Sequence, residues 1–175
     1  MRIRNIEQER AAYGRELGAE WNREQKRQRI EVAQAWAEEM VQPILDNPYA
    51  LFAFMSALWL GEGSKKDNVL EFTNSDPKII AGWLTLLRSL FEIEERKLRG
   101  QVLLNHRMDE GDCCEFWTGI TKIPLTQFHK SQIDERTGKR QREGYQGVFR
   151  VTYHSSEIRR QIGALGFAIL RELNR

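Results

Sequence analysis

Residues 55–63, with the sequence MSALWLGEG, restrict the fold of this chain more than any other segment. They predict the last turns of an apolar helix that ends at Gly61, Glu62 and Gly63. Large apolar residues cover most of this helix, which predicts burial on nearly all sides. The unpaired carbonyl groups at a helix carboxyl end repel an anion such as Glu62 by about 0.3–1 kcal/mol. We therefore expect a cation close to this end of the helix.

Small residues form one side of the same helix. Ala53, Ala57 and Gly61 recur at every fourth position, so they stack on one face. This spacing lets a second backbone approach closely, as is best documented for membrane helices. If the second helix is a symmetry-related copy, two Glu62 carboxylates converge, and a divalent metal would have to offset their repulsion. A core helix whose Glu62 simply faces solvent fits the same residues.

The composition favours one domain with an extension. Of the 175 residues, 41% are hydrophobic, and 27 Lys and Arg against 25 Asp and Glu give a net charge of +2. A nucleic-acid surface would therefore depend on local clusters of cations. The adjacent Cys113 and Cys114 lack a second pair for a zinc site, so we expect reduced thiols. The polar N-terminus and the absence of an apolar run of about 18 residues predict a soluble, cytoplasmic protein without a membrane partner.

Residues 1–46 predict a helical N-terminal extension rich in Glu, Gln, Arg and Ala. Its apolar residues repeat at helical spacing, so we expect this stripe to be buried against another surface. Residues 23–29 form a basic turn, for which a solvated helix face and contact with phosphate are alternative interpretations. The apolar stripe consists of Tyr13, Leu17, Trp21, Ile30, Ala33, Ala37, Met40 and Ile44.

Residues 47–175 predict an α+β domain, because helical and strand-like segments follow one another. Asn47 and Asp76 precede prolines and predict the starts of two helices, and Ser155 or Ser156 predicts the start of the last one. This order favours a mixed sheet with helices on one face and the other face open. We expect strands at 69–74 and 97–105, a helix at 112–122, and a hairpin with strands at 127–134 and 148–153.

The predicted hairpin carries a net charge of +3, since six cations stand against three acids. A two-stranded ribbon can enter the major groove of DNA, where Arg and Lys read guanine and further cations neutralise phosphate. A hairpin that is merely kept soluble by its charge is an equally good interpretation. The cations are Lys130, Arg136, Lys139, Arg140, Arg142 and Arg150, and the acids are Asp134, Glu135 and Glu143.

Residues 55–63 align without gaps with the nine-residue LAGLIDADG motif of homing endonucleases, with Glu62 and Gly63 in the places of its last acid and glycine. Residues 59–80, WLGEGSKKDNVLEFTNSDPKII, also resemble a bacterial and archaeal subgroup that carries GEGS after its first helix. The resemblance covers roughly residues 47–173. It implies a LAGLIDADG-like fold and a saddle-shaped homodimer whose sheets lie over double-stranded DNA, with paired motif helices that meet at Ala53, Ala57 and Gly61.

The resemblance also implies a catalytic site. A divalent ion, Mg²⁺ or Mn²⁺, would be bound by the Glu62 carboxylate and the Gly61 carbonyl and would support hydrolysis of DNA phosphodiester bonds. Lys130, with His154 behind it, is expected as the basic catalytic residue near the metal. Because each chain has one motif, two cuts require a homodimer. The residues expected to contact DNA are Lys65, Lys66, Arg99, Lys130, Arg136, Lys139, Arg140, Arg142 and Arg150.

Two features differ from this family. Residues 64–74 leave room only for a short stub where the family has a long DNA-reading hairpin, and residues 1–46 contain no helix-turn-helix, so the extension is a remnant or a dimer brace. Two alternatives to an endonuclease stay open: a catalytically silent DNA-binding transcriptional regulator on the same fold, and a helical interaction protein built on the extension. An intact Glu62 favours the enzyme, because a carboxylate directed at phosphates weakens DNA binding.

Overall fold

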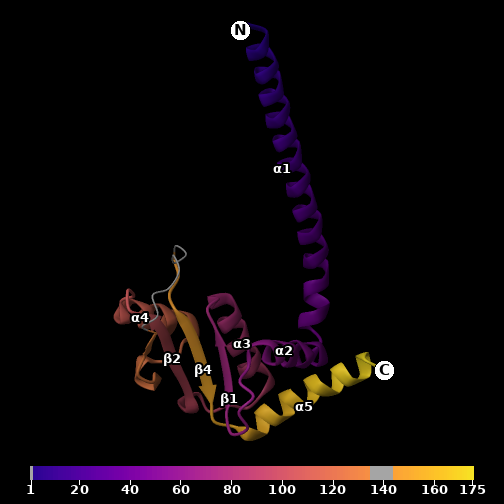
Figure 1. The fold of residues 1–175 in the computed structure, drawn as a ribbon. Helices are drawn as coiled ribbons and strands as arrows, with labels where there is room; N and C mark the ends of the chain where they lie inside the picture. Colours follow the sequence, from indigo (N-terminus) through magenta and orange to yellow (C-terminus); the bar gives the residue numbers. More distant parts are fainter. Residues whose placement is uncertain (1, 135–143) are drawn as a thin grey trace. The chain divides into compact units, whose positions relative to one another are not determined.

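The computed structural model describes residues 2–134 and 144–175, with side chains described from residue 13 onward. The chain divides into two compact units, Met1–Asn47 and Pro48–Arg175. The first unit is one continuous helix, α1 (Arg2–Leu45), which is about 66 Å long at the usual rise per residue (Figure 1). Its large apolar side chains from Tyr13 to Leu45 are all at least 42% exposed. The apolar stripe of α1 is therefore exposed rather than buried.

The second unit is an α+β domain, as the sequence predicts. Its described residues form four strands in one mixed sheet, with the order β1-β4-β2-β3 (Figure 1). The strands are β1 (Leu70–Asn74), β2 (Leu98–Asn105), β3 (Gln132–Asp134) and β4 (Val148–Tyr153). The helices are α2 (Pro48–Glu62), α3 (Pro77–Leu90), α4 (Glu110–Thr121) and α5 (Ser156–Leu173), with short 3₁₀ turns η1 (Glu95–Lys97) and η2 (Leu125–Gln127).

Capping residues start two of these helices where the sequence predicts them. The Asp76 side chain accepts a hydrogen bond of 2.8 Å from the backbone N–H of Lys78, and Pro77 occupies the first turn of α3. The Ser155 hydroxyl accepts one of 3.2 Å from the N–H of Ile158 in the first turn of α5. Each cap satisfies a backbone donor that the first turn of a helix leaves unpaired. Both helix starts are therefore set by the local sequence.

The sheet has one buried face and one open face, which confirms the predicted arrangement. Along β2, alternate residues from Leu98 to Leu104 are buried. Arg99, Gln101 and Leu103 lie between them and are partly exposed, because successive side chains point to opposite faces of a strand. Helices cover the buried face, and the fully buried tryptophans of this core are Trp59, Trp83 and Trp117.

The prediction that residues 127–153 form a hairpin is wrong. β3 pairs in parallel with β2, whereas β4 lies between β1 and β2 and is antiparallel to both. Phe149, Val151 and Tyr153 of β4 all belong to the core, and a central position covers them from both sides. Four cations of the expected hairpin lie outside the described residues: Arg136, Lys139, Arg140 and Arg142.

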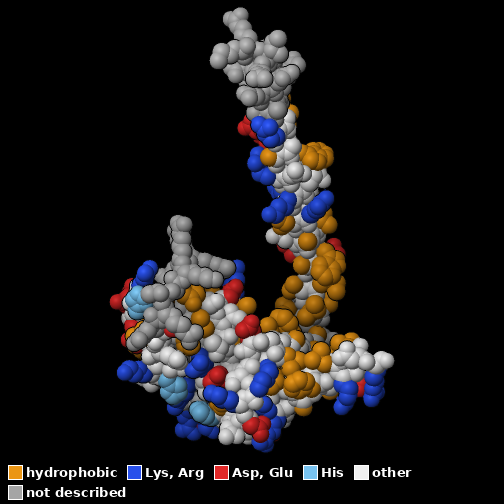
Figure 2. Space-filling model, in the orientation of Figure 1, with side chains coloured by type: hydrophobic (Ala, Val, Ile, Leu, Met, Phe, Trp, Pro, Cys, Tyr) orange, Lys and Arg blue, Asp and Glu red, His pale blue; other side chains and the backbone are white. Residues whose placement is uncertain are grey.

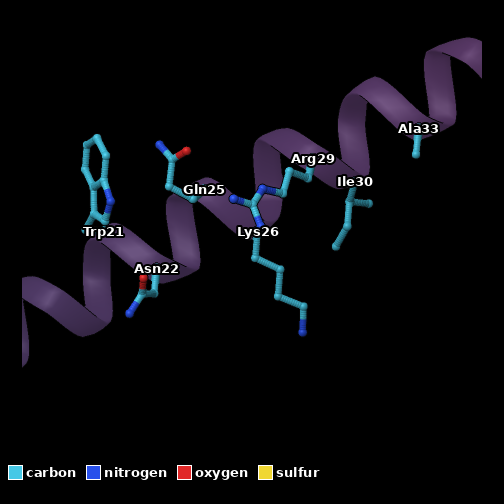
Figure 3. Close-up of a pocket in the computed structure, with 7 residues that line it drawn as sticks. All are labelled: Trp21, Asn22, Gln25, Lys26, Arg29, Ile30 and Ala33. Carbon is cyan, nitrogen blue, oxygen red and sulfur yellow. The ribbon is translucent and has the colours of Figure 1, made fainter.

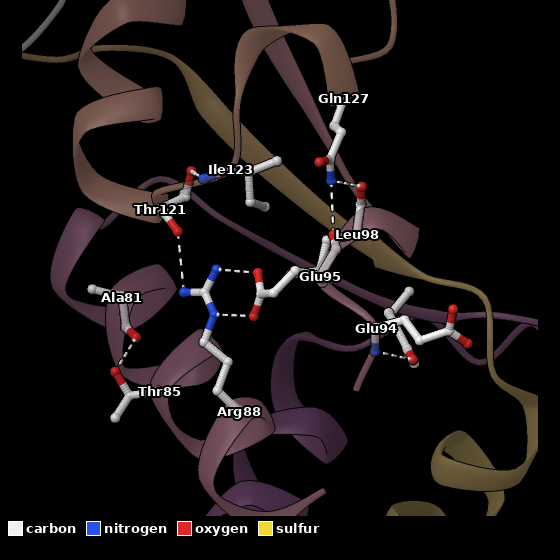
Figure 4. Close-up of polar contacts among 10 residues, drawn as sticks. Ala81, Thr85, Arg88, Glu94, Glu95, Leu98, Thr121, Ile123 and Gln127 are labelled. Carbon is white, nitrogen blue, oxygen red and sulfur yellow. Dashed lines mark hydrogen bonds and ion pairs between the residues drawn. The ribbon is translucent and has the colours of Figure 1, made fainter. Parts of the chain in front are cut away.

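A polar cluster connects the helices to the start of β2 (Figure 4). The Arg88 guanidinium donates two hydrogen bonds to the Glu95 carboxylate, at 2.8 and 2.9 Å, and one of 3.1 Å to the Thr121 carbonyl. The Gln127 amide donates to the carbonyls of Glu95 and Leu98 at 2.8 Å each. The hydrogen bonds from Arg88 lower the pKa of Glu95 below its ordinary value. This cluster holds α3, α4 and both 3₁₀ turns in one arrangement.

Candidate functional site

Helix α2 packs closely against α5 because α5 has small residues at the contact. A Cβ atom at Gly166 would lie 2.8 Å from Leu60 Cδ1, and one at Gly163 would lie 3.1 Å from Trp59 Cζ3. Such distances are too short for ordinary packing, so glycine is what allows the two helices to approach. The close approach within the chain therefore uses a different side of α2 from the predicted stripe of small residues.

That stripe is uncovered. Ala57 and Gly61 are exposed, Ala53 is partly exposed, and a Cβ atom at Gly61 would meet no neighbouring group of the described chain within 4 Å. Phe54, on the same side of the helix, is 54% exposed. Within one chain, α2 is therefore buried on only part of its surface, and the predicted burial on nearly all sides would need a second copy. Figure 2 shows hydrophobic side chains at the surface over α2 and α5.

The cation expected at the end of α2 is the ammonium group of Lys65. Its Nζ atom donates hydrogen bonds to the backbone carbonyls of Trp59, Leu60 and Gly63 at 2.8, 3.1 and 3.0 Å. It also lies 4.0 Å from the centroid of the Trp59 ring. Burial lowers the pKa of Lys65, and the charge of Arg159 lowers it further. Lys65, which the prediction places on DNA, thus offsets the electronegative end of α2 within its own chain.

A short stub of antiparallel pairing follows α2, as the spacing of this segment predicts. Gly63 forms an isolated antiparallel bridge with Phe72, and the Ser64 N–H donates a hydrogen bond of 3.0 Å to the Glu71 carbonyl. A Cβ atom at Gly63 would lie 2.6 Å from Trp59 Cγ, so a residue with a side chain does not fit without a shift of the indole. These contacts fix the backbone immediately after Glu62.

The Glu62 side chain is exposed and forms no hydrogen bond or ion pair with any described residue. Its carboxylate and the Gly61 carbonyl are possible metal ligands. Across residues 2–134 and 144–175, no three His, Cys, Asp or Glu side chains lie close enough together to hold a metal ion. Magnesium in proteins is often bound by one or two carboxylates, with water and phosphate oxygens as the other ligands. One chain provides such a minimal set, and a second copy would double it.

The structure separates Lys130 from Glu62. Gly63 lies beside β1 at one edge of the sheet, while Phe128 pairs with β2 on the side away from β4. Four interstrand spacings lie between them, which amounts to about 19 Å. His154 is exposed and follows the end of β4. Glu62 and Lys130 are therefore not brought together within one chain.

The open face of the sheet carries a row of polar side chains. Arg150 of β4 donates a hydrogen bond of 2.8 Å to Gln101 of β2, which donates one of 2.9 Å to the Lys130 carbonyl. Arg150 Nε also lies 3.7 Å from the Glu71 carboxylate of β1. Arg99, on the same face, donates to two nearby backbone carbonyls at 2.7 and 2.8 Å. Both arginines are thus on the open face, where Glu71 offsets part of the charge of Arg150.

The contacts of Lys65 and Arg159 near this site are not predicted from residues 55–63. A lysine just beyond a helix end commonly bonds the last carbonyls, so the capping role of Lys65 has a recognisable local signal. The ion pair of Arg159 with Asp67, at 2.9 Å, joins positions 92 residues apart, and no local pattern predicts it. Lys66, also expected on DNA, is exposed, and its ammonium group bonds to no described residue.

Two further predictions concern residues outside the site. Cys113 and Cys114 are buried free thiols in α4, and burial raises the pKa of both. Among the described helices, none combines the length and apolar character needed to cross a membrane.

Comparison with known proteins assigns no family. No protein-family model matches the chain, and no curated protein or solved structure matches it. The geometry of the residues around α2 and the open sheet face is therefore the basis for a functional proposal.

Proposed function

We propose that the protein acts as a homodimer that binds double-stranded DNA and hydrolyses its phosphodiester bonds with a divalent metal, Mg²⁺ or Mn²⁺, at Glu62. The observation that carries this proposal is an exposed carboxylate, unpaired among the described residues, beside an uncovered stripe of small residues on α2. An acid at the carboxyl end of a helix does not stabilise the helix. A functional role explains why it is there.

A second copy of α2 fits the uncovered stripe. Contact at Ala57 and Gly61 would let the two backbones approach closely and would bring two Glu62 carboxylates together. Like charges at short distance favour a shared divalent cation. The same contact would cover Phe54, and full burial of such a side chain contributes roughly 1.5–3 kcal/mol.

The open face of the sheet supports duplex DNA as the partner. Arg99, Gln101 and Arg150 lie on this face, and arginine and glutamine recognise guanine and adenine edges in the major groove. The exposed Lys130 adds positive charge at one edge, where it could neutralise phosphate. Binding would require Arg150 to exchange its contact with Glu71 for a DNA group.

The protein would contribute to the metal site by holding the ligands of the metal in place. When bound, the metal would activate water and stabilise the leaving oxygen. Gly63 and its bridge to Phe72 hold Glu62 between the end of α2 and the edge of β1. The three carbonyls bonded by Lys65 do not include that of Gly61, so this oxygen stays available as a second ligand.

Cleavage of plasmid DNA tests the proposal. We expect the purified protein to nick or linearise a plasmid that contains its native locus in Mg²⁺ or Mn²⁺. Glu62→Ala should abolish cutting while DNA binding persists or tightens, because a carboxylate near phosphate is removed. Glu115→Ala is the matched control, since Glu115 is an exposed glutamate on α4 that lies away from the proposed site. Absence of product with either metal would contradict the enzyme.

The dimer is tested by light scattering on the same preparations. Ala57→Leu fills the uncovered stripe and should convert the dimer to a monomer. An unchanged mass would place the contact between copies elsewhere.

A catalytically silent DNA-binding regulator is the second candidate. Lys65 favours it, because its ammonium already offsets the negative end of α2 and the fold needs no metal there. In this case, wild-type protein would shift DNA in a gel without cutting it in either metal, and Glu62→Ala would leave the shift unchanged or strengthen it. Gel shift and plasmid cleavage together separate the two functions.

A further inference from the structure

Charge is segregated on the N-terminal half of α1. Arg15, Lys26 and Arg29, named here the cationic strip, lie at spacings of 11 and 3 residues, which places them on one side of a continuous helix. Asn22 lies on the same side, four residues before Lys26. The other side carries acids at spacings of four and seven residues, namely Glu16, Glu20, Glu24 and Glu31.

The two sides differ in how their charges are satisfied. Arg27, on the acidic side, donates to Glu24 at 2.7 and 3.0 Å and to Glu31 at 3.3 Å. Lys26 and Arg29 have no acidic residue three or four positions away, and their side chains bond to no described residue. Side-chain pairs on a helix form at those spacings, so the cationic strip has no partner on α1 itself. Its charge is available to an external anion.

The groups beside the strip also favour an anionic partner. Lys26 and Arg29 border an open hollow that is lined by α1 residues alone, with Trp21 at one end and Ala33 at the other (Figure 3). Its polar lining consists of cations, amides and an indole N–H, all of which can donate hydrogen bonds, and it contains no carboxylate. Along the length of the helix, Figure 2 shows Lys and Arg at the surface of its described N-terminal part and more hydrophobic side chains toward its C-terminal end.

We propose that the cationic strip binds the phosphate backbone of double-stranded DNA, as a contact separate from the open sheet face. This inference shares the DNA partner of the proposed function but does not depend on Glu62 or on cleavage. The helix from Arg15 to Arg29 is about 21 Å long, which equals the length of about six base pairs. A duplex offers phosphates over that whole length, whereas a small anion would satisfy only part of the strip. Because phosphates carry no sequence information, the strip should add affinity for any duplex.

The experiment removes the same charge from the two sides of α1. Lys26→Gln and Arg29→Gln act on the strip, and Arg27→Gln is the matched control beside them. Binding of the full chain to two unrelated duplexes of about 30 base pairs is measured by anisotropy, without divalent metal, from roughly 50 to 200 mM salt. Each strip variant should bind up to about fivefold more weakly at low salt and lower the slope of log affinity against log salt by about 0.9. Arg27→Gln should bind like wild type, and circular dichroism should show equal helicity for all variants.

The outcomes separate this inference from the proposed function. Equal losses for Arg27→Gln and the strip variants would overturn the inference, because total charge would then decide binding. Strip variants that bind like wild type would overturn it while leaving DNA binding by the sheet intact. A wild-type protein that binds neither unrelated duplex would overturn this inference, whereas the proposed function is decided by cleavage of the native locus. Binding to anionic lipid vesicles in place of DNA, lost in Lys26→Gln, would identify a membrane surface as the partner and overturn the DNA assignment.

Discussion

Helices α1 and α2 are stabilised in different ways. α2 buries Met55, Ser56 and Trp59 against the rest of its unit, and Lys65 closes its carboxyl end. α1 exposes its large apolar side chains and depends on its length and on exposed side-chain pairs such as Glu24–Arg27. Tertiary contacts therefore fix α2, so a single added atom should change the stability of the second unit. Substitutions of the exposed side chains of α1 should change stability little, and these side chains are accessible to a partner.

The strongest test of this contrast is a methyl group at the end of α2. Gly63→Ala would place Cβ 2.6 Å from Trp59 Cγ, in an indole that is 1% exposed and packed on all sides. Forced overpacking of this kind should destabilise the second unit by about 3 kcal/mol. Urea unfolding followed by tryptophan fluorescence measures the change.

Two glycines provide matched controls for Gly63→Ala. A Cβ atom at Gly82 of α3 or at Gly18 of α1 meets no neighbouring group within 4 Å. Alanine at either position should raise helix stability by about 0.5–1 kcal/mol, because glycine loses more backbone entropy in a helix. Equal stability of Gly63→Ala and Gly82→Ala would mean that the indole is free to move, and the contrast between the two helices would fail.

A smaller effect is expected from the charge that closes α2. Lys65→Met removes three hydrogen bonds to backbone carbonyls and should destabilise the second unit by about 1 kcal/mol in the same urea experiment. Lys66→Met removes an equal charge from the adjacent exposed residue and should change stability by less than about 0.5 kcal/mol. Lys26→Met on α1 should behave like Lys66→Met, since the cationic strip stabilises no packed structure. A loss at Lys66 as large as that at Lys65 would show that total charge, not the helix cap, is responsible.

The same contrast explains which parts of the structure the sequence predicts. Asp76 and Ser155 cap helices by accepting hydrogen bonds from residues two or three positions away, so the local sequence predicts these helix starts. The alternation of residues along β2 likewise predicts which of its side chains are buried. The place of β4 depends on Phe149 and Val151 meeting a core built from distant segments. The local sequence predicts that β4 pairs with β3 in a hairpin, because the residues between them contain a turn-forming glycine. The alternation of apolar residues within a strand does not identify the strand that it pairs with.

The candidate site was predictable to a similar extent. The end of α2 at Glu62 and the short stub after it follow from the glycines and the length of the connecting segment. The separation of Lys130 from Glu62 does not, because it depends on strand order, which is a property of the whole sheet. The sequence also does not predict which side of α2 is uncovered, since the residues on that side are as apolar or as small as buried residues.

The smallest effect, and the last test of the contrast, is one of pH. Hydrogen bonds from Arg88 lower the pKa of Glu95 in the folded protein, so the carboxylate stabilises the fold above its unfolded pKa and loses this effect as the pH falls through the folded pKa. Glu95→Gln should therefore reduce stability at pH 7, by less than about 1 kcal/mol because Glu95 is 57% exposed, and this deficit should shrink as the pH is lowered to 3. Arg27 lowers the pKa of Glu24 in the same way on α1, yet Glu24→Gln should leave the unfolding of the second unit unchanged at both pH values, because that pair stabilises only its own helix. An equal deficit of Glu95→Gln at pH 7 and pH 3, measured by urea unfolding, would show that the amide disturbs packing and that charge has no part in holding α3 to η1.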